Sequence, residues 1–205
     1  MLIDLSRCVG CNACTVACKV SNVTPQGVFF THVDKVESGK FPNTQSLFFP
    51  RACMQCDSAP CVTVCPTNAT YKRSDGIVMV DQSKCIGCRY CIAACPYGAR
   101  TYMEKIQSYF ESGTLQFEID GFAQYQVGTV AKCEFCAKRL DQGYQPACVQ
   151  TCPTVARHFG DLDDPNSEIS QLIISSKAVQ LLPELGTNPS VYFVLPKQQL
   201  TLVKR

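Results

Sequence analysis

Cysteines are the residues of this sequence whose type and spacing can do chemistry. The chain has 16 cysteines in 205 residues but only two histidines. The cysteines form four groups of four that read C-x2-C-x2-C-x3-C, C-x2-C-x4-C-x3-C, C-x2-C-x2-C-x3-C and C-x2-C-x11-C-x3-C, so none is left over. The groups are Cys8, Cys11, Cys14 and Cys18; Cys53, Cys56, Cys61 and Cys65; Cys85, Cys88, Cys91 and Cys95; and Cys133, Cys136, Cys148 and Cys152.

This spacing is typical of thiolates that bind [4Fe–4S] clusters. A tight cysteine loop reaches three iron corners of a cubane, and the fourth cysteine lies one helical turn further on, directed towards a second cluster. Pro66, Pro96 and Pro153 follow the fourth cysteine in three groups and should end the helix there. Lys19 stands in that place in group one, so we expect a looser turn. The sequence therefore predicts four [4Fe–4S] clusters.

Two other uses of so many thiols fit less well. Structural zinc sites are built from paired C-x2-C knuckles, whereas the second halves of these groups read C-x3-C. Disulfide scaffolds belong to oxidising compartments. The first residues have no basic stretch, long apolar run or cleavage site, so we expect no signal peptide, and the apolar runs are too short for a transmembrane segment.

The spacing leaves two ways to share the fourth cysteines between clusters. Groups two and three are close neighbours, as in a compact two-cluster ferredoxin, and groups one and four then pair by elimination. The alternative pairs group one with two and three with four, across 34 and 37 residues, and spacing alone does not decide. The nested sets are Cys8, Cys11, Cys14 with Cys152; Cys133, Cys136, Cys148 with Cys18; Cys53, Cys56, Cys61 with Cys95; and Cys85, Cys88, Cys91 with Cys65.

The elements that position these cysteines must be small. We predict an α+β fold of two bacterial-ferredoxin-like units with nested connectivity, short strands and helices, loop insertions and a C-terminal tail. Strands are expected at residues 2–5, 77–80 and 191–195, and a helix capped by Ser167 at residues 168–182. The predicted division is 1–52 for the first half of unit A with an insertion, 53–98 for unit B, 99–160 for an insertion and the second half of unit A, and 161–205 for a tail that packs on a partner or on unit A.

Charge and motifs exclude several function classes. The formal net charge is only +2, which argues against a nucleic-acid reader, and no G-x-G-x-x-G or phosphate-binding loop predicts a nucleotide cofactor. No residue pattern indicates catalysis of bond making. Cations next to the cysteines are either ordinary solvated residues or tune the cluster potentials; the candidates are Arg7, Lys84, Arg89 and Lys132.

The cysteine motifs together resemble one family. These motifs are Cys8-Val9-Gly10-Cys11, Cys85-Ile86-Gly87-Cys88-Arg89-Tyr90-Cys91, Cys95-Pro96-Tyr97-Gly98, and Cys133-Glu134-Phe135-Cys136 with Pro146-Ala147-Cys148. They resemble the four-cluster electron-transfer subunit of molybdopterin enzymes of the dimethyl sulfoxide reductase type. The segment from Phe159 to Ser167 is similar to the polysulfide, thiosulfate, tetrathionate and arsenate reductase branches.

The resemblance implies the nested pairing and a relay between a molybdenum or tungsten pterin catalytic subunit and a quinone-reactive membrane subunit in anaerobic respiration. It implies that the cluster of Cys8, Cys11 and Cys14 faces the catalytic subunit and that of Cys85, Cys88 and Cys91 the membrane partner. Cys88 stands where some relatives have tryptophan, so a four-iron cluster is expected. Association with the membrane would then come through partners, with export beside a twin-arginine catalytic subunit, and otherwise the protein would be cytoplasmic. The alternative function is a free polyferredoxin shuttle.

Overall fold

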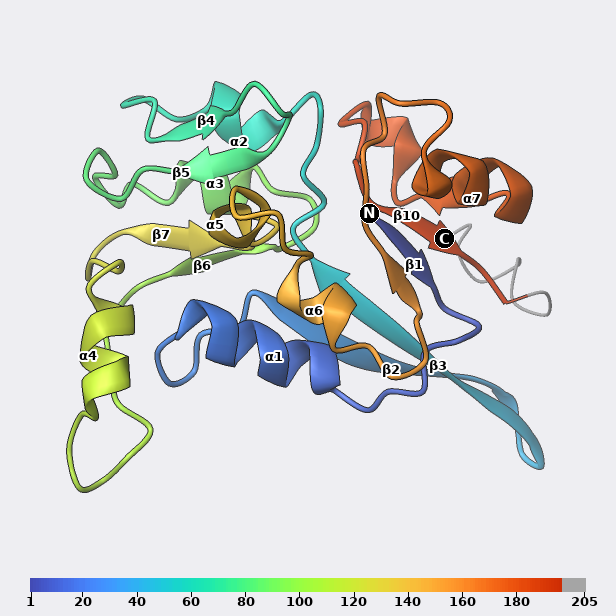
Figure 1. Cartoon of the computed structure of the whole chain (residues 1–205), viewed down its shortest axis with the longest axis horizontal. Coiled ribbons are helices and arrows are strands. Elements are labelled where there is room, and N and C mark those ends of the chain that lie inside the picture. Colours follow the sequence, from blue (N-terminus) through green and yellow to red (C-terminus); the bar gives the residue numbers. More distant parts are fainter. Residues whose placement is uncertain (197–205) are drawn as a thin grey trace.

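The computed structural model describes residues 1–196 apart from the side chain of Ser38, so residues 197–205 of the predicted tail segment lie outside it (Figure 1). The helices and strands within it are short. Among the described residues, none of the helices has the length and apolar character needed to cross a membrane.

A four-stranded sheet joins the two ends of the described chain. Its order is β8 (Arg157–His158), β1 (Leu2–Asp4), β10 (Tyr192–Val194) and β9 (Val179–Gln180). β1 runs parallel to β10 and antiparallel to β8, so that Ile3 is opposite both Phe193 and Arg157. Ile3 and Phe193 are almost completely buried, and their burial supplies the apolar contacts that stabilise so short a sheet.

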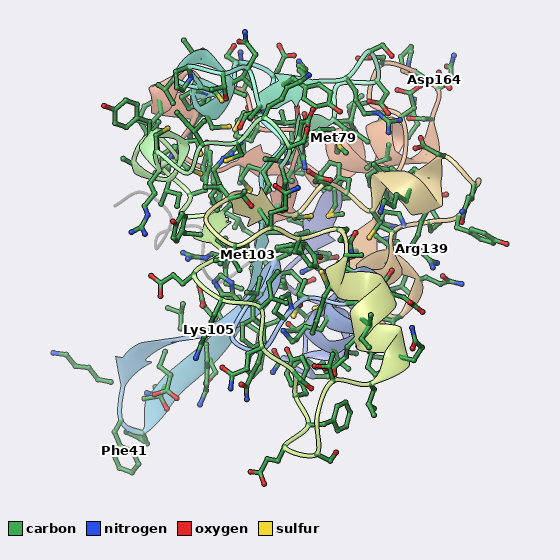
Figure 2. All side chains as sticks on the ribbon, turned by 90° about the vertical axis from the view of Figure 1, so that its left-hand side faces the viewer. Phe41, Met79, Met103, Lys105, Arg139 and Asp164 are labelled. Atoms are coloured by element: carbon green, nitrogen blue, oxygen red, sulfur yellow. The ribbon has the colours of Figure 1, made fainter. Side chains whose placement is uncertain are left out.

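The first insertion forms a long antiparallel hairpin. Strands β2 (Thr31–Lys40) and β3 (Asn43–Ala52) pair along their full length, from Thr31 opposite Ala52 to Lys40 opposite Asn43. The base of the hairpin is anchored in the core, where Phe49 stacks on Phe193 with ring centroids 4.9 Å apart. Figure 2 shows Phe41 at the opposite end, directed away from the body, and 92% of this residue is exposed.

Two pairs of short helices each contain cysteines of two groups. α1 (Ala13–Asn22) packs against α6 (Ala147–Gln150), and α2 (Pro60–Thr63) packs against α3 (Tyr90–Ala93). α2, α3 and α6 end just before a Cys-Pro pair, as predicted from proline. Because Lys19 replaces proline in group one, α1 continues four residues beyond Cys18, and the Lys19 ammonium instead donates to the carbonyl of Val28 at 2.6 Å.

Two short antiparallel strand pairs and one helix complete the region between the cysteine groups. β4 (Thr70–Lys72) pairs with β5 (Val78–Val80), and β6 (Arg100–Tyr102) pairs with β7 (Val130–Lys132). The second insertion contains α4 (Gln116–Phe122), and α5 (Ala137–Leu140) follows β7. A second apolar cluster binds this insertion to the first one; its buried members are Cys18, Val28, Phe30, Met103, Phe122, Tyr125 and Ala131.

The predicted tail is integrated into the body. Helix α7 (Glu168–Ser176) begins as predicted, with the Ser167 hydroxyl accepting from the Ser170 amide at 3.3 Å. The prediction of its end at residue 182 was wrong, because Lys177 adopts the left-handed conformation with φ of 51° and Val179 belongs to β9. The 3₁₀ turn η1 (Pro183–Leu185) follows, and β10 then pairs with β1.

Candidate metal-cluster sites

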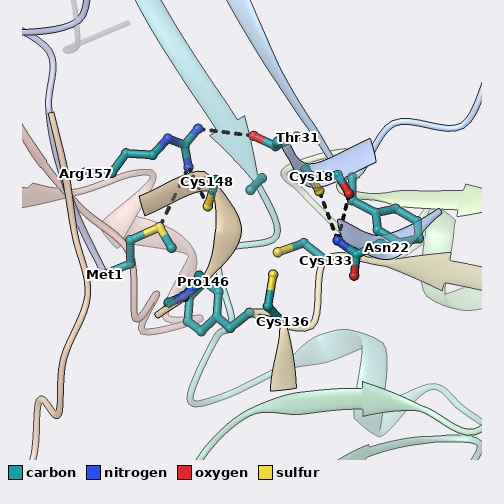
Figure 3. Close-up of a pocket in the computed structure, with 12 residues that line it drawn as sticks. Met1, Cys18, Asn22, Thr31, Cys133, Cys136, Pro146, Cys148 and Arg157 are labelled. Carbon is teal, nitrogen blue, oxygen red and sulfur yellow. Dashed lines mark hydrogen bonds between the residues drawn. The ribbon is translucent and has the colours of Figure 1, made fainter. Parts of the chain in front are cut away.

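One pocket collects four cysteines from three separate parts of the chain. Cys18 at α1, Cys133 and Cys136 in the loop before α5, and Cys148 in α6 line the same enclosed space. Figure 3 shows their sulfur atoms directed towards one another. These are the four residues of one predicted nested set, and they come together because α1 and α6 pack side by side.

Two further pockets each contain another predicted set. One is lined by Cys53, Cys56, Cys61 and Cys95, and the other by Cys65, Cys85, Cys88 and Cys91. Three pockets that each contain four thiols have the composition expected of sites for the same kind of group.

The remaining set lies around the start of α1. Burial raises the pKa of the Cys8 thiol, and the charges of Cys14 and Cys152 raise it further. These three members of the set therefore lie close enough to interact electrostatically. Cys11 is exposed at the protein surface. Three of the predicted sets thus each line one pocket, whereas the fourth set, with Cys11, stays a prediction.

Each of the four C-x2-C loops turns through the left-handed conformation. The residue before the second cysteine has a positive φ in every group: 70° at Gly10, 46° at Gln55, 69° at Gly87 and 50° at Phe135. Glycine adopts this conformation freely, whereas it costs another residue roughly 1–2 kcal/mol. The strained backbone held in place at Gln55 and Phe135 is typical of functional sites.

Hydrogen bonds reach the sulfur atoms of three of the fourth cysteines. The Thr70 amide donates to Cys65 Sγ at 3.3 Å, and the Ala156 amide donates to Cys152 Sγ at 3.2 Å. Burial raises the pKa of both thiols, but these and neighbouring donors outweigh it, and the net pKa of each is lowered. In group one the donor is the Asn22 side-chain amide, 3.5 Å from Cys18 Sγ. Such bonds favour the thiolate and are one determinant of cluster potential.

The inner thiols are too buried to ionise alone near neutral pH. Burial raises the pKa of Cys18 to about 12 and that of Cys56 to about 11, and it raises the pKa of Cys133 well above its usual range. A bound metal deprotonates coordinating thiols. Among the described residues, no three His, Cys, Asp or Glu side chains come together closely enough to hold one metal ion. The donor set and the enclosed spaces between the thiols thus fit a polynuclear iron–sulfur group.

Buried cations accompany the sites, and two of them were missed from the sequence. Lys132 is 2% exposed and donates to the carbonyls of Val78 and Cys133. Arg100 and Arg157, which sequence reasoning did not select, are 6% and 2% exposed. The signal was present, because the sequence C-P-x-x-A-R places both arginines five residues after a fourth cysteine.

The other three predicted tuning residues lie at the surface. Arg7 is exposed. Lys84 is exposed and pairs with Asp81 at 3.3 Å. Arg89 is exposed and lies over the Tyr102 ring, with its guanidinium carbon 3.7 Å from the ring centroid. Water and salt screen charges in such positions much more than in the interior.

A polar contact connects the inner pockets. Gln55, only 1% exposed, donates from its amide nitrogen to the Cys133 carbonyl at 2.7 Å and accepts from the Val78 amide at 2.8 Å. The Glu134 carboxylate accepts from the Val80 amide at 2.8 Å. Gln55 belongs to one inner pocket's loop and Cys133 to the other, so this contact fixes the two sites relative to one another.

Family comparisons agree with the cysteine chemistry. A model described as a 4Fe-4S dicluster domain matches residues 44–118 and 120–162, and a second model with the same description matches residues 7–69. Together they cover every cysteine.

Curated relatives are similar over 95% of the chain. The B subunit of selenate reductase from Mesobacillus selenatarsenatis is 45% identical and is covered over 70% of its own length. The B subunit of tetrathionate reductase from Salmonella typhimurium is 42% identical, with 71% covered. The arsenate respiratory reductase iron–sulfur subunit of a Shewanella species is 40% identical, with 94% covered.

Proposed function

Because the chain belongs to the family of iron–sulfur B subunits of molybdopterin reductases, and is an electron-transfer subunit with 4Fe–4S clusters, we propose that its 16 cysteines hold four such clusters in the nested sets. The subunit is not catalytic alone. Its relatives are subunits of reductases, which does not favour the free polyferredoxin shuttle.

One observation carries the proposal of nested sets. Three pockets are each lined by four cysteines, and each quartet takes three cysteines from one group and the fourth from its nested partner. The sequential alternative would put Cys18 with Cys53, Cys56 and Cys61, yet Cys18 lines the pocket of Cys133, Cys136 and Cys148. The fourth set, Cys8, Cys11, Cys14 and Cys152, is supported by the charges that act between Cys8, Cys14 and Cys152.

The same proposal orders the four sites into a single file. Contacts join Cys14 to Cys148 through Arg157, the Cys53 loop to Cys133 through Gln55, and the Cys61 pocket to the Cys91 pocket through Arg100 and Thr70. Each of these pairs joins two consecutive nested sets. The file therefore begins at the set of Cys8 and ends at the set of Cys85, with the Cys133 and Cys53 sets between them.

The two ends of this file are the exposed ones. Cys11 and Cys88 are the exposed cysteines, and they belong to the first and last sets. Apolar side chains surround each end in the sequence: Val9 and Val16 are 57% and 60% exposed near Cys11, and Ile86 and Tyr90 are 67% and 64% exposed near Cys88. Exposed apolar residues beside a redox site support docking of a partner there.

We infer two partners for these ends, from the family to which the chain belongs. The pterin catalytic subunit, with molybdenum or tungsten, would dock at the Cys11 end, and a quinone-reactive membrane subunit would dock at the Cys88 end. The protein would then be held at the membrane by its partners and would travel with an exported catalytic subunit. The predicted division into units A and B with an integrated tail belongs to the same proposal.

The chain itself would contribute position, burial and electrostatics. When bound, each [4Fe–4S] cluster supplies a one-electron redox couple whose potential depends on charge, hydrogen bonds to sulfur and exposure. The thiols of each pocket would hold it, and the Thr70, Ala156 and Asn22 donors would stabilise the negative charge on sulfur. Apolar residues around the inner pockets, among them Met54, Phe30 and Phe135, exclude water from them.

Anaerobic isolation with metal analysis tests the proposal. The full chain should be brown and contain about sixteen irons and as many acid-labile sulfides, as four [4Fe–4S] clusters require. It should be recovered from gently solubilised membranes together with a large molybdenum- or tungsten-containing polypeptide. A colourless protein that contains zinc and no sulfide would refute the cluster assignment, and a brown protein without any partner would refute the subunit assignment.

A further inference from the structure

Two buried arginines occupy equivalent places in the two units. Arg100 ends the sequence Cys95-Pro96-Tyr97-Gly98-Ala99-Arg100, and Arg157 ends Cys152-Pro153-Thr154-Val155-Ala156-Arg157. Arg100 is the first residue of β6 and Arg157 is the first residue of β8, and each strand follows the turn after a fourth cysteine. A repeated position for a buried cation in both units suggests a shared purpose beyond packing.

Arg157 contacts thiols of two different sets. Its Nη1 atom lies 3.8 Å from Cys148 Sγ and its Nη2 atom lies 3.7 Å from Cys14 Sγ. Figure 3 shows Arg157 and Cys148. Nη2 also donates to the Thr31 hydroxyl at 3.1 Å, which holds the guanidinium in place. Cys14 belongs to the outer set of unit A and Cys148 to the inner one. The guanidinium thus lies between two neighbouring sites.

Arg100 stands in the same relation to the two sets of unit B. It lines the pocket of Cys53, Cys56, Cys61 and Cys95, and its hydrogen-bond partner Thr70 lines the pocket of Cys65, Cys85, Cys88 and Cys91. Its Nη1 atom donates to the Thr70 hydroxyl at 3.1 Å, as Arg157 does to Thr31. Its buried Nη2 atom has no hydrogen-bond partner within the described part of the chain. A donor is therefore left over on the guanidinium that acts on both sets.

A buried guanidinium is stable only beside negative charge. Arginine stays protonated under all ordinary conditions, and a buried cation without a counter-ion is strongly unfavourable. Neutral thiols do not supply that charge, and no carboxylate forms an ion pair with either arginine among the described residues. Thiolates that hold an anionic cluster on each side do supply it.

We propose that Arg100 and Arg157 are bridging counter-ions, each raising the reduction potentials of the two clusters beside it. The inference rests on the proposed four-cluster function. An electron that arrives from the adjacent cluster adds one negative charge to its acceptor, and no bond forms or breaks and no proton moves. Because one guanidinium faces both sites, it favours the reduced state of either. The arginines are positioning residues for charge rather than ligands.

Redox titration of the full chain under anaerobic conditions, followed by low-temperature EPR, tests the proposal. In R157Q, two of the four clusters should reduce at lower potential, by at least tenfold in the reduction equilibrium constant, or about 59 mV for one electron. The other two should be unchanged. R100Q should shift the complementary two. R157K and R100K, which keep a charge, should shift each pair less than the glutamine variants do.

Arg7 provides the matched control, because it is adjacent to Cys8 but exposed. R7Q should leave all four potentials within error of the parent protein. Equal shifts in R7Q and R157Q, shifts of all four clusters in one variant, or no shift in R157Q and R100Q would each overturn the proposal.

Cluster loss in the glutamine variants is also decisive. If R157Q or R100Q assembles fewer irons while the lysine variant assembles the full number, charge between the sites is needed and the proposal holds. If the lysine and glutamine variants lose iron equally, shape rather than charge is needed and the proposal fails. A parent protein without iron and sulfide would instead refute the proposed function, which separates that failure from this one.

Discussion

Paired cysteine substitutions distinguish the nested sets from the sequential ones by counting. In C18A/C136A, the nested sets lose two ligands from one site, and in C18A/C56A they lose one ligand from each of two sites. Sequential sharing reverses these outcomes, because it puts Cys18 with Cys56 and apart from Cys136. The pocket that contains Cys18, Cys136 and Cys148 but not Cys56 is the structural reason to expect the first pattern.

The magnitudes follow from the number of sites touched. A chain with four clusters holds about sixteen irons. C18A/C136A should lose up to about four irons and leave three unaltered EPR signals, whereas C18A/C56A should lose up to about eight and leave two. The single variants C18A, C136A and C56A should each alter one signal. They are the controls for additivity, since substitutions in one site are expected to be non-additive and those in separate sites additive.

Iron, acid-labile sulfide and EPR spin counts on anaerobically purified variants measure the outcome. Normal far-ultraviolet circular dichroism of each variant is needed to establish that the chain has folded. Two unaltered signals in C18A/C136A together with three in C18A/C56A would refute the nested assignment. Equal losses in both double variants would show that the sites do not assemble independently.

Three other substitutions test separate parts of the structure. Q55L removes the side-chain acceptor of the buried Val78 amide and one of the two donors to the Cys133 carbonyl, and it should lower the free energy of unfolding by about 1–3 kcal/mol in urea titration. G87A should reduce iron content, because φ is 69° and its Cβ would collide with the Gly128 carbonyl, whereas G98A, equally left-handed at 59° but in open space, should reduce it less. Burial raises the pKa of Glu118, but the Ser108 hydroxyl and the amides of Tyr109 and Leu115 outweigh it and the net pKa is lowered. The carboxylate therefore stabilises the fold above its unfolded pKa of about 4.3. Hydrogen exchange of residues 108–118 should then be faster in E118Q at pH 7, and the difference should vanish as the pH falls below that range.

The local structure around the cysteine groups could be predicted from the sequence. The grouping and its proline endings predicted short helices that end at Cys-Pro, and the structure has α2, α3 and α6 at those places. The strands expected at residues 2–5, 77–80 and 191–195 are present as β1, β5 and β10. The iron–sulfur family was also predicted, and the relatives confirm it. The ligand sets stay a prediction that the pockets support.

Features that depend on contacts between residues far apart in the sequence could not be predicted. The end of α7 depends on the pairing of Val179 and Gln180 with β10, which no local signal specifies. Arg157 was overlooked because its burial depends on contacts with Met1 and Thr31, which lie 156 and 126 residues away in the sequence. Charge adjacent to a cysteine in sequence proved a poor guide to charge adjacent in space, since Arg7 and Lys84 are exposed while Arg100 is buried.

The polar contact between the two inner pockets bears on the proposed relay. In that proposal, electron transfer through four sites in file depends on a fixed distance between the inner two sites. Apolar contacts alone tolerate sliding, whereas hydrogen bonds have preferred directions and distances. Gln55 donates to the carbonyl of Cys133 and accepts from the amide of Val78, and Lys132 also donates to the Cys133 carbonyl. Because these partners are backbone groups, the hydrogen bonds would fix the backbones of both cysteine loops relative to one another.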